Sequence, residues 1–202
     1  LALGRRGEAD LLLVHSPADE ARFVADGFAS ERVPLMYNHF IIVGPADDPA
    51  QVVSAPSAVE ALRRIAGAGA TWVSRDDASG TDALGRALWE QAAVALPDGQ
   101  HIRSGQGMGA TLRVTDARHA YTLGDRATFL TLRPHLAMEI LYPEDAALLN
   151  PYSVILVDAA RFPAGRIRAE GAAAFAQWLA GPTARQRIES FGTERFGEAL
   201  FR

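Results

Sequence analysis

Trp72-Val73-Ser74-Arg75-Asp76-Asp77-Ala78-Ser79-Gly80-Thr81 is the stretch of sequence that decides the fold and the candidate site. Its apolar start is typical of a short buried strand, and the pattern from Asp82 to Ala95 predicts a helix after it. Strand, polar loop and helix in this order form the unit from which α/β folds are built. In such folds ligands bind at the carboxyl ends of strands, where loops lead into helix N-termini.

The loop in this stretch has the chemistry of an anion site. The first N–H groups of a helix have no intrahelical acceptor, and the helix dipole adds positive potential there. The hydroxyls of Ser79 and Thr81 can donate to anion oxygens, and Arg75 can donate to two oxygens at once. Gly80 lets a ligand approach the backbone closely. A purely structural interpretation is equally open, in which Ser79 only caps the helix and Arg75 only pairs with an aspartate that follows it.

Outward from this stretch, short apolar runs alternate with helical patterns, which favours a mainly parallel α/β architecture. The strands that we expect cover residues 10–15, as a buried parallel strand, then 40–43, 71–73, 120–123, 138–141 and 153–157. We expect one helix to end near residue 7. Further helices are expected at residues 16–25, 57–66, 82–95, 110–117, 128–132, 171–179 and 183–190. Turns are expected at residues 44–49 and at Pro97-Asp98-Gly99.

Two further segments carry candidate donors. The loop Gly105-Gln106-Gly107-Met108-Gly109 precedes a predicted helix, and its glycines let the backbone form a concave nest of N–H groups. A flexible turn is the alternative, and the spacing differs from the dinucleotide pattern G-x-G-x-x-G. Near the end of the predicted strand 120–123, Tyr121 and Thr122 can each offer a hydroxyl or an N–H group.

Composition narrows the function classes. The 202 residues are 49% hydrophobic, enough for one large domain or two lobes with cores. A formal net charge of −4 does not favour nucleic acid or an anionic membrane. The chain has no cysteine, which excludes disulfides and cysteine chemistry. No histidine pair has metal-site spacing, and neither G-x-S-x-G nor a Walker A motif occurs.

Several long motifs, in order, resemble the tungstate-binding proteins of ABC importers, the TupA family. They are LGRRGEADLLLVH at residues 3–15, MYNHFIIVGP at 36–45, VSRDDASGT at 73–81, GQGMGATL at 105–112, AYTLGDRAT at 120–128 and NPYSVI at 150–155. The resemblance runs along nearly the whole chain. It implies a type II periplasmic-binding fold, in which two α/β lobes close over the anion about a hinge.

By this resemblance the first lobe comprises residues 1–43 plus 151–202, and the second comprises residues 44–150. The ligand-binding residues that we expect are Ser74, Arg75, Ser79, Gly80, Thr81, Gly107, Met108, Gly109, Tyr121 and Thr122. The family begins further upstream and has first-lobe donors there, so we expect the N-terminal part of the first lobe to be missing. A start at Leu1 without Met and without a visible signal peptide agrees with a truncation.

The resemblance implies a transport protein, periplasmic or extracellular and lipid-anchored, that delivers its anion to the membrane permease of an ABC importer. We expect a monomer without catalysis, cofactor, metal, nucleic acid or membrane insertion. Tungstate and molybdate are fully ionised dianions and need only donors, whereas hydrogen phosphate also needs an acceptor. A phosphate- or sulfate-type binding protein and the effector-sensing domain of a transcription regulator are alternatives. A third alternative is an enzyme that acts on a phosphorylated substrate, with His15 or Asp125 as the general base.

Overall fold

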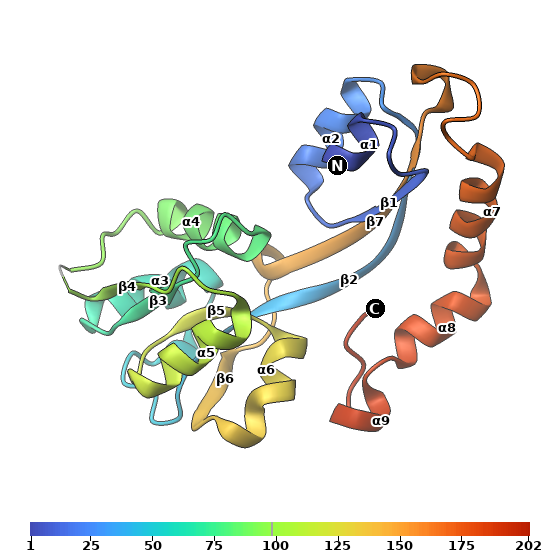
Figure 1. Ribbon diagram of the computed structural model, residues 1–202. Coiled ribbons are helices and arrows are strands. Elements are labelled where there is room, and N and C mark those ends of the chain that lie inside the picture. The colour runs from blue at the N-terminus through green and yellow to red at the C-terminus, as the bar shows by residue number, and fades with distance from the viewer. Residues whose placement is uncertain (98) are drawn as a thin grey trace. The chain divides into compact units, whose positions relative to one another are not determined.

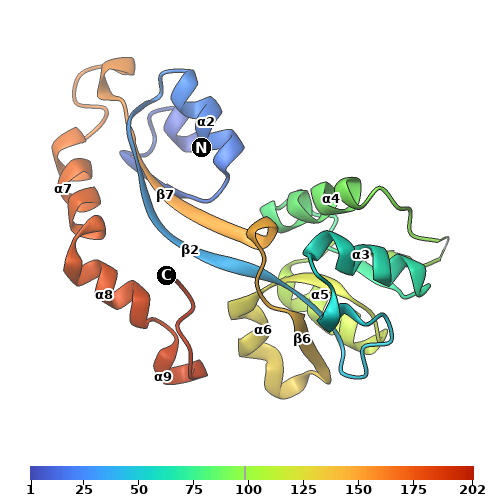
Figure 2. The same cartoon turned by 180° about the vertical axis from the view of Figure 1, so that it is seen from behind.

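The computed structural model describes residues 1–97 and 99–202, so Asp98 of the expected turn lies outside the described residues. The chain forms two compact units (Figures 1 and 2). Unit 1 comprises Leu1–Asn38 and Asn150–Arg202, and unit 2 comprises His39–Leu149. The sequence predicts a first lobe at residues 1–43 plus 151–202 and a second lobe at residues 44–150, which close over the ligand. These lobe bounds and the closure stay a prediction.

Unit 1 has a sheet with helices on both faces. Its elements are α1 (Ala2–Arg5), β1 (Leu11–Val14), α2 (Pro17–Ala25), the first part of β2 (Ala29–Pro45), nearly all of β7 (Leu149–Val157), α7 (Ala169–Ala180), α8 (Pro182–Ser190) and α9 (Thr193–Phe196). Successive side chains of a strand point to opposite faces. Ile155 of β7 packs in one core with Phe23 of α2, and Val154 packs in another with Ala172 of α7.

The first expected strand departs from its prediction. β1 pairs with β7 in antiparallel register, Leu12 opposite Ile155, so the expectation of a parallel strand at residues 10–15 is wrong. It is also not buried throughout, because Leu13 is 51% exposed while Leu12 is buried. An apolar run fits either orientation, since the partner strand is far away in sequence and leaves no local signal.

Unit 2 places its sheet between two pairs of helices. Its elements are the end of β2, α3 (Ala58–Gly67), β3 (Trp72–Ser74), α4 (Gly80–Ala92), β4 (His101–Arg103), α5 (Met108–Ala117), β5 (Thr122–Asp125), α6 (Arg126–Leu132) and β6 (Met138–Tyr142). β2 is buried on both faces here. Ile42 lies in the core with Leu62 of α3, whereas Ile41 lies in the core with Leu112 of α5.

The pairing in unit 2 is mixed. β2 pairs antiparallel with both β5 and β6, whereas β3 and β4 are parallel. A parallel bridge between Trp72 and Tyr121 continues β3 toward β5. The expected parallel arrangement therefore holds for the strands around the candidate site, and the expectation of a mainly parallel sheet is wrong for the rest.

Element bounds follow local signals closely. Ser57 caps α3 by accepting a hydrogen bond from the N–H of Glu60, as its position predicts. Helices α4, α5 and α6 begin two residues earlier than expected. Gly44 lies inside β2 rather than in a turn, and an added Cβ would lie 2.6 Å from Cε1 of Tyr121. β4 and α9 have no counterpart among the expected elements.

Candidate functional site

Three strands of unit 2 end at one edge, and each leads into the N-terminus of a helix. β3, β4 and β5 run in the same direction, and they precede α4, α5 and α6 respectively. Parallel strands direct their carboxyl ends to the same side of a sheet, so the unpaired N–H groups of the following helices gather there. The local order of strand, loop and helix therefore creates this edge.

The loop from Arg75 to Ser79 is tightly turned. Asp76 and Ala78 both have left-handed backbone conformations, with φ of 51° and 57°. Ser79 caps α4, because its hydroxyl accepts a hydrogen bond from the N–H of Asp82 at 3.3 Å. Ser79 therefore has the capping role that the sequence left open. The first N–H groups of α4 still point out of the start of the helix.

The N-termini of α4 and α5 retain free donors. Within residues 1–97 and 99–202, no acceptor contacts the backbone N–H groups of Gly80, Thr81, Met108 and Gly109. Gly107 caps α5, and the Met108 side chain is buried in the core beside Leu112, so only its backbone is free to bind a ligand. The predicted contribution of this loop is thus confined to its N–H groups.

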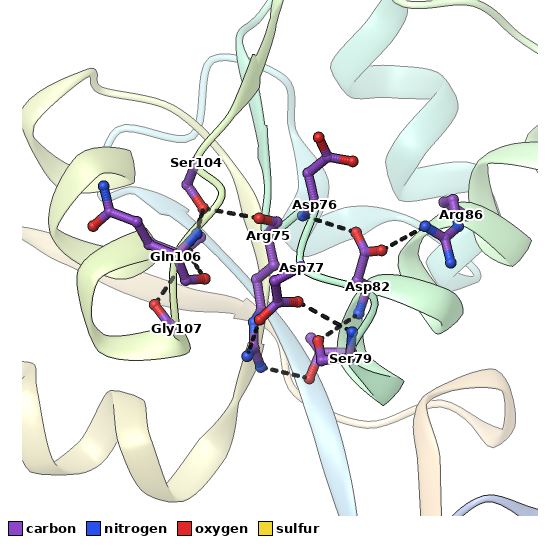
Figure 3. Close-up of polar contacts among 11 residues, drawn as sticks. Arg75, Asp76, Asp77, Ser79, Asp82, Arg86, Ser104, Gln106 and Gly107 are labelled. Atoms are coloured by element: carbon purple, nitrogen blue, oxygen red, sulfur yellow. Dashed lines mark hydrogen bonds and ion pairs between the residues drawn. The ribbon is translucent and has the colours of Figure 1, made fainter.

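Arg75 lies at the centre of the polar contacts (Figure 3). Its Nη2 lies 2.5 Å from Oδ2 of Asp77, and its Nη1 lies 3.4 Å from Oγ1 of Thr81. The side chain is only 18% exposed. Its Nε is buried and has no hydrogen-bond partner among the described residues. A buried donor without an acceptor is costly, so the described residues leave the guanidinium incompletely satisfied.

Asp77 supplies the counter-charge. Its Oδ1 accepts a hydrogen bond from the backbone N–H of Ser79 at 3.2 Å. Hydrogen bonds from Ser79 and from Arg75 hold the pKa of the Asp77 carboxyl below its usual range, so the group is ionised at neutral pH. In Figure 3 the Asp77 carboxylate turns toward Arg75, whereas the carboxylate of Asp76 points away.

Asp82 fixes the loop from within the helix. Its carboxylate is almost fully buried, with 3% of the side chain exposed. Oδ1 accepts the backbone N–H of Asp76 at 2.9 Å, and Oδ2 accepts Nη1 of Arg86 at 2.6 Å. A buried carboxylate with two donors is a strong local anchor. It holds the backbone next to Arg75 in its left-handed turn.

The glycine-rich loop is joined to the Arg75 loop through Ser104. The Ser104 hydroxyl donates to the backbone oxygen of Arg75 at 3.3 Å and lies 2.8 Å from Oγ1 of Thr111 in α5. Thr111 in turn donates to the backbone oxygens of Gln106 and Gly107. The N-termini of α4 and α5 are therefore held side by side by a short hydrogen-bond chain.

The remaining expected ligand contacts are engaged elsewhere. The Tyr121 hydroxyl is buried, accepts the N–H of Ala50 at 3.0 Å and donates to Asp48 at 3.1 Å. Burial raises the pKa of Tyr121 above its ordinary value. The hydroxyl of Thr122 donates to the Val73 backbone oxygen at 2.7 Å. The Ser74 hydroxyl lies 2.9 Å from Nε2 of His101. These three side chains support the loops, and their hydroxyls are not directed to Arg75.

A cavity of about 500 Å³ extends from this edge of unit 2. Its lining includes the polar side chains of Ser74, Arg75 and Thr81 and the aromatic side chains of Trp72 and Trp89. The two indole rings pack edge to face with centroids 5.4 Å apart. A volume of this order is that of a small-molecule pocket. Of the candidate donors on α4 and in its loop, Arg75 and Thr81 therefore border this cavity, whereas the glycine-rich loop before α5 lies outside its lining.

Sequence reasoning missed three contributors to this site. Asp82 forms with Ser79 the S-x-x-D pattern of a capping box, so a local signal for it existed. His101 belongs to β4 and Ser104 follows it. This strand has three residues with one apolar side chain, Ile102, which is too short for a periodic strand signal.

Residues proposed for other chemistry have structural contacts. Nδ1 of His15, in unit 1, lies 3.1 Å from Oδ1 of Asn150, and the imidazole stacks on Tyr152. Asp125 caps α6 by accepting hydrogen bonds from Thr128. The described part of the chain has no cluster of three or more His, Cys, Asp or Glu side chains that could hold a metal. Over the same residues, every helix is too short or too polar to cross a bilayer.

Comparison with known proteins places the chain in a class. The family model described as "PBP superfamily domain" matches residues 1–183. The tungstate-binding protein TupA of Peptoclostridium acidaminophilum is 39% identical over 203 residues, which cover 100% of this chain and 70% of that protein. The chain therefore belongs to the PBP superfamily and, within it, to the TupA family of tungstate-binding proteins.

Solved structures agree with this placement. The tungstate-binding protein TupA from Desulfovibrio alaskensis G20 superposes with a TM-score of 0.90 at 37% identity, over 99% of this chain and 80% of that one. The tungstate ABC transporter protein from Geobacter sulfurreducens superposes with a TM-score of 0.80 at 37% identity, over 94% of this chain and 80% of that one. The α/β fold expected from the sequence is confirmed as one of the periplasmic-binding type.

Proposed function

We propose that the protein binds tungstate or molybdate and delivers it to the permease of an ABC importer. The observation that carries the proposal is the convergence of donors at one edge of unit 2. The Arg75 guanidinium, with a buried Nε that has no partner among the described residues, lies against Thr81 at the start of α4, and Ser104 joins the Arg75 backbone to the loop before α5. The membership of the TupA family supports the same ligand class.

The donor set suits a dianion that accepts hydrogen bonds only. Backbone N–H groups and the guanidinium can donate but cannot accept. The hydroxyl oxygens of Ser79 and Thr81 already accept hydrogen bonds within the chain, so these groups are left to donate. The N–H groups lie at helix N-termini, where the dipole favours negative charge, and Arg75 lies in the loop before one of these helices. Of the expected residues, we retain Arg75, Ser79 and Thr81 as side-chain donors, and Gly80, Gly107, Met108 and Gly109 as backbone contacts. Ser74, Tyr121 and Thr122 become supporting residues in this proposal.

A phosphate-type ligand has one specific observation in its favour. Hydrogen phosphate needs an acceptor for its proton, and the Asp77 carboxylate lies against Arg75. The two ligand classes differ in what Asp77 does to them, because a carboxylate attracts a proton donor and repels a fully ionised dianion.

Isothermal titration calorimetry with tungstate, molybdate, sulfate and phosphate tests the proposal. We expect heats of binding for tungstate and molybdate, and much weaker binding of sulfate and phosphate. Tight phosphate binding without tungstate binding would replace the proposal by the phosphate alternative. Absence of binding for all four anions would refute an oxyanion function.

The wider role follows from the family and is part of the same proposal. The protein works outside the cytoplasm, in the periplasm or on a lipid anchor at the cell surface, as a monomer that meets a permease. Binding uses protein donors alone and needs no cofactor, and the protein is not an enzyme. Turnover of phosphorylated compounds by the purified protein would contradict this assignment.

A further inference from the structure

Asp77 pairs with Arg75, the charged donor that the proposed ligand would use. One carboxylate oxygen accepts from Nη2 of Arg75 and the other from the backbone N–H of Ser79. A guanidinium and a helix-start N–H are also the two donor types proposed for the oxyanion. The carboxylate therefore already satisfies, from within the chain, part of the site that an external anion needs.

The Asp77 carboxylate is held only by its own loop. Its hydrogen bonds go to Arg75 and Ser79, each two residues away, and 22% of the side chain is exposed. The two neighbours of Asp77, Asp76 and Ala78, have left-handed conformations that L residues adopt at some cost. A group attached this locally can turn outward without disturbing the core of unit 2.

Asp82 keeps the loop in place when Asp77 moves. Its buried carboxylate binds the backbone N–H of Asp76 and the guanidinium of Arg86, and neither contact involves Asp77. The backbone anchor and the counter-ion of Arg75 are thus separate residues. This separation allows the counter-ion to be replaced while the donors keep their positions.

We propose that Asp77 is an internal competitor of the oxyanion, which pairs with the Arg75 guanidinium and is displaced from it when the ligand binds. The inference rests on the proposed function, because it concerns the same donors. A dianion near a carboxylate is repelled by it, and the ligand must also break the Arg75–Asp77 ion pair. Asp77 therefore lowers affinity and restricts the site to anions that bind strongly enough to displace it.

The test compares Asp77→Asn with Asp76→Asn. The Asp77→Asn side chain can still accept the N–H of Ser79, but it no longer neutralises Arg75. Asp76→Asn removes the same charge one residue away, from a carboxylate that has no hydrogen bond or ion pair in the described structure. Asn tolerates the left-handed backbone at position 76. Urea unfolding checks that both variants remain folded.

Calorimetry with sodium tungstate supplies the readout. We expect Asp77→Asn to lower Kd at least tenfold, and Asp76→Asn to change it less than threefold. In a structure of the tungstate complex, Nη2 of Arg75 and Oδ2 of Asp77 should be more than about 4 Å apart, beyond ion-pair distance.

The outcomes separate the two claims. If the wild-type protein binds tungstate and Asp77→Asn binds it equally or more weakly, Asp77 positions Arg75 instead, and the competitor is refuted while the proposed function stands. An equal increase in tungstate affinity in both variants would indicate a general effect of charge and would also refute the competitor role of Asp77. Binding by Asp77→Asn alone supports the competitor. If neither protein binds, the proposed function and this inference both fail.

Discussion

Arg75→Ala is the substitution that tests the anion site most directly. The side chain presents two nitrogens to the loop, with Nη1 near Thr81 and Nη2 on Asp77, and it is only 18% exposed. A hydrogen bond to a charged group contributes about 1.5–3 kcal/mol. Two such bonds to an oxyanion correspond to roughly 3–6 kcal/mol, and part of this is offset because the wild-type ligand must break the pair with Asp77.

A net loss of about 3 kcal/mol corresponds to roughly a hundredfold or greater rise in Kd for tungstate. The assay is calorimetry at two salt concentrations, because added salt screens exposed charges more than buried ones. Arg75→Lys should give an intermediate loss, since it retains the charge and loses the planar fork.

The matched control is Arg103→Ala. Arg103 carries the same charge and lines the same cavity as Arg75, but its side chain is exposed. We expect its removal to change Kd less than about threefold, because exposed charges contribute little. Binding of tungstate by Arg75→Ala within threefold of the wild type, or an equal loss in both variants, would refute the assignment of Arg75 to the anion site.

Three further substitutions test the support of the site. Asp82→Ala leaves the N–H of Asp76 without its buried acceptor, so urea unfolding should show a loss of about 2 kcal/mol and calorimetry weaker tungstate binding. Gly44→Ala forces a Cβ within 2.9 Å of Cδ1 of Leu141 and still closer to the ring of Tyr121; we expect a loss of about 1–3 kcal/mol, and wild-type stability would show that the strand shifts freely. Tyr121→Phe should cost about 2 kcal/mol at neutral pH by removing one buried and one partly buried hydrogen bond. Because burial raises the pKa of Tyr121, the wild type is fully stabilised below the unfolded-state value of about 10 and loses stability as pH rises above it, whereas the phenylalanine variant should not share this loss.

The parts of the fold that depend on local chemistry could be predicted. Ser57 and Glu60 mark the start of α3, and the order of strand, loop and helix around Arg75 places the donors at a carboxyl edge. The TupA resemblance was confirmed by comparison because its motifs extend along the chain. The capping and loop signals each lie within a short segment, and the family resemblance is the sum of several such segments.

The rest depends on contacts between distant segments. Leu12 pairs with Ile155 in antiparallel register, which an apolar run of four residues does not encode. Tyr121 was expected to offer its hydroxyl or its N–H group to the ligand. The hydroxyl bonds to Asp48, and nothing in the residues around Tyr121 indicates that partner. Likewise, the bond from Ser104 to the Arg75 backbone could not be seen, because β4 itself was not predicted.

The arrangement of the chain in the two units bears on the order in which they form during synthesis. Unit 2 is one uninterrupted segment, His39–Leu149, whereas unit 1 combines Leu1–Asn38 with Asn150–Arg202. A ribosome that has just translated residue 149 has supplied every strand of unit 2, but it has not yet supplied β7, the partner of β1. Domains generally fold as units while synthesis proceeds. We therefore expect the unit with the anion donors to fold first. Residues 1–38 should stay without their partner strand, with their apolar side chains exposed, until residues 150–202 have been synthesised.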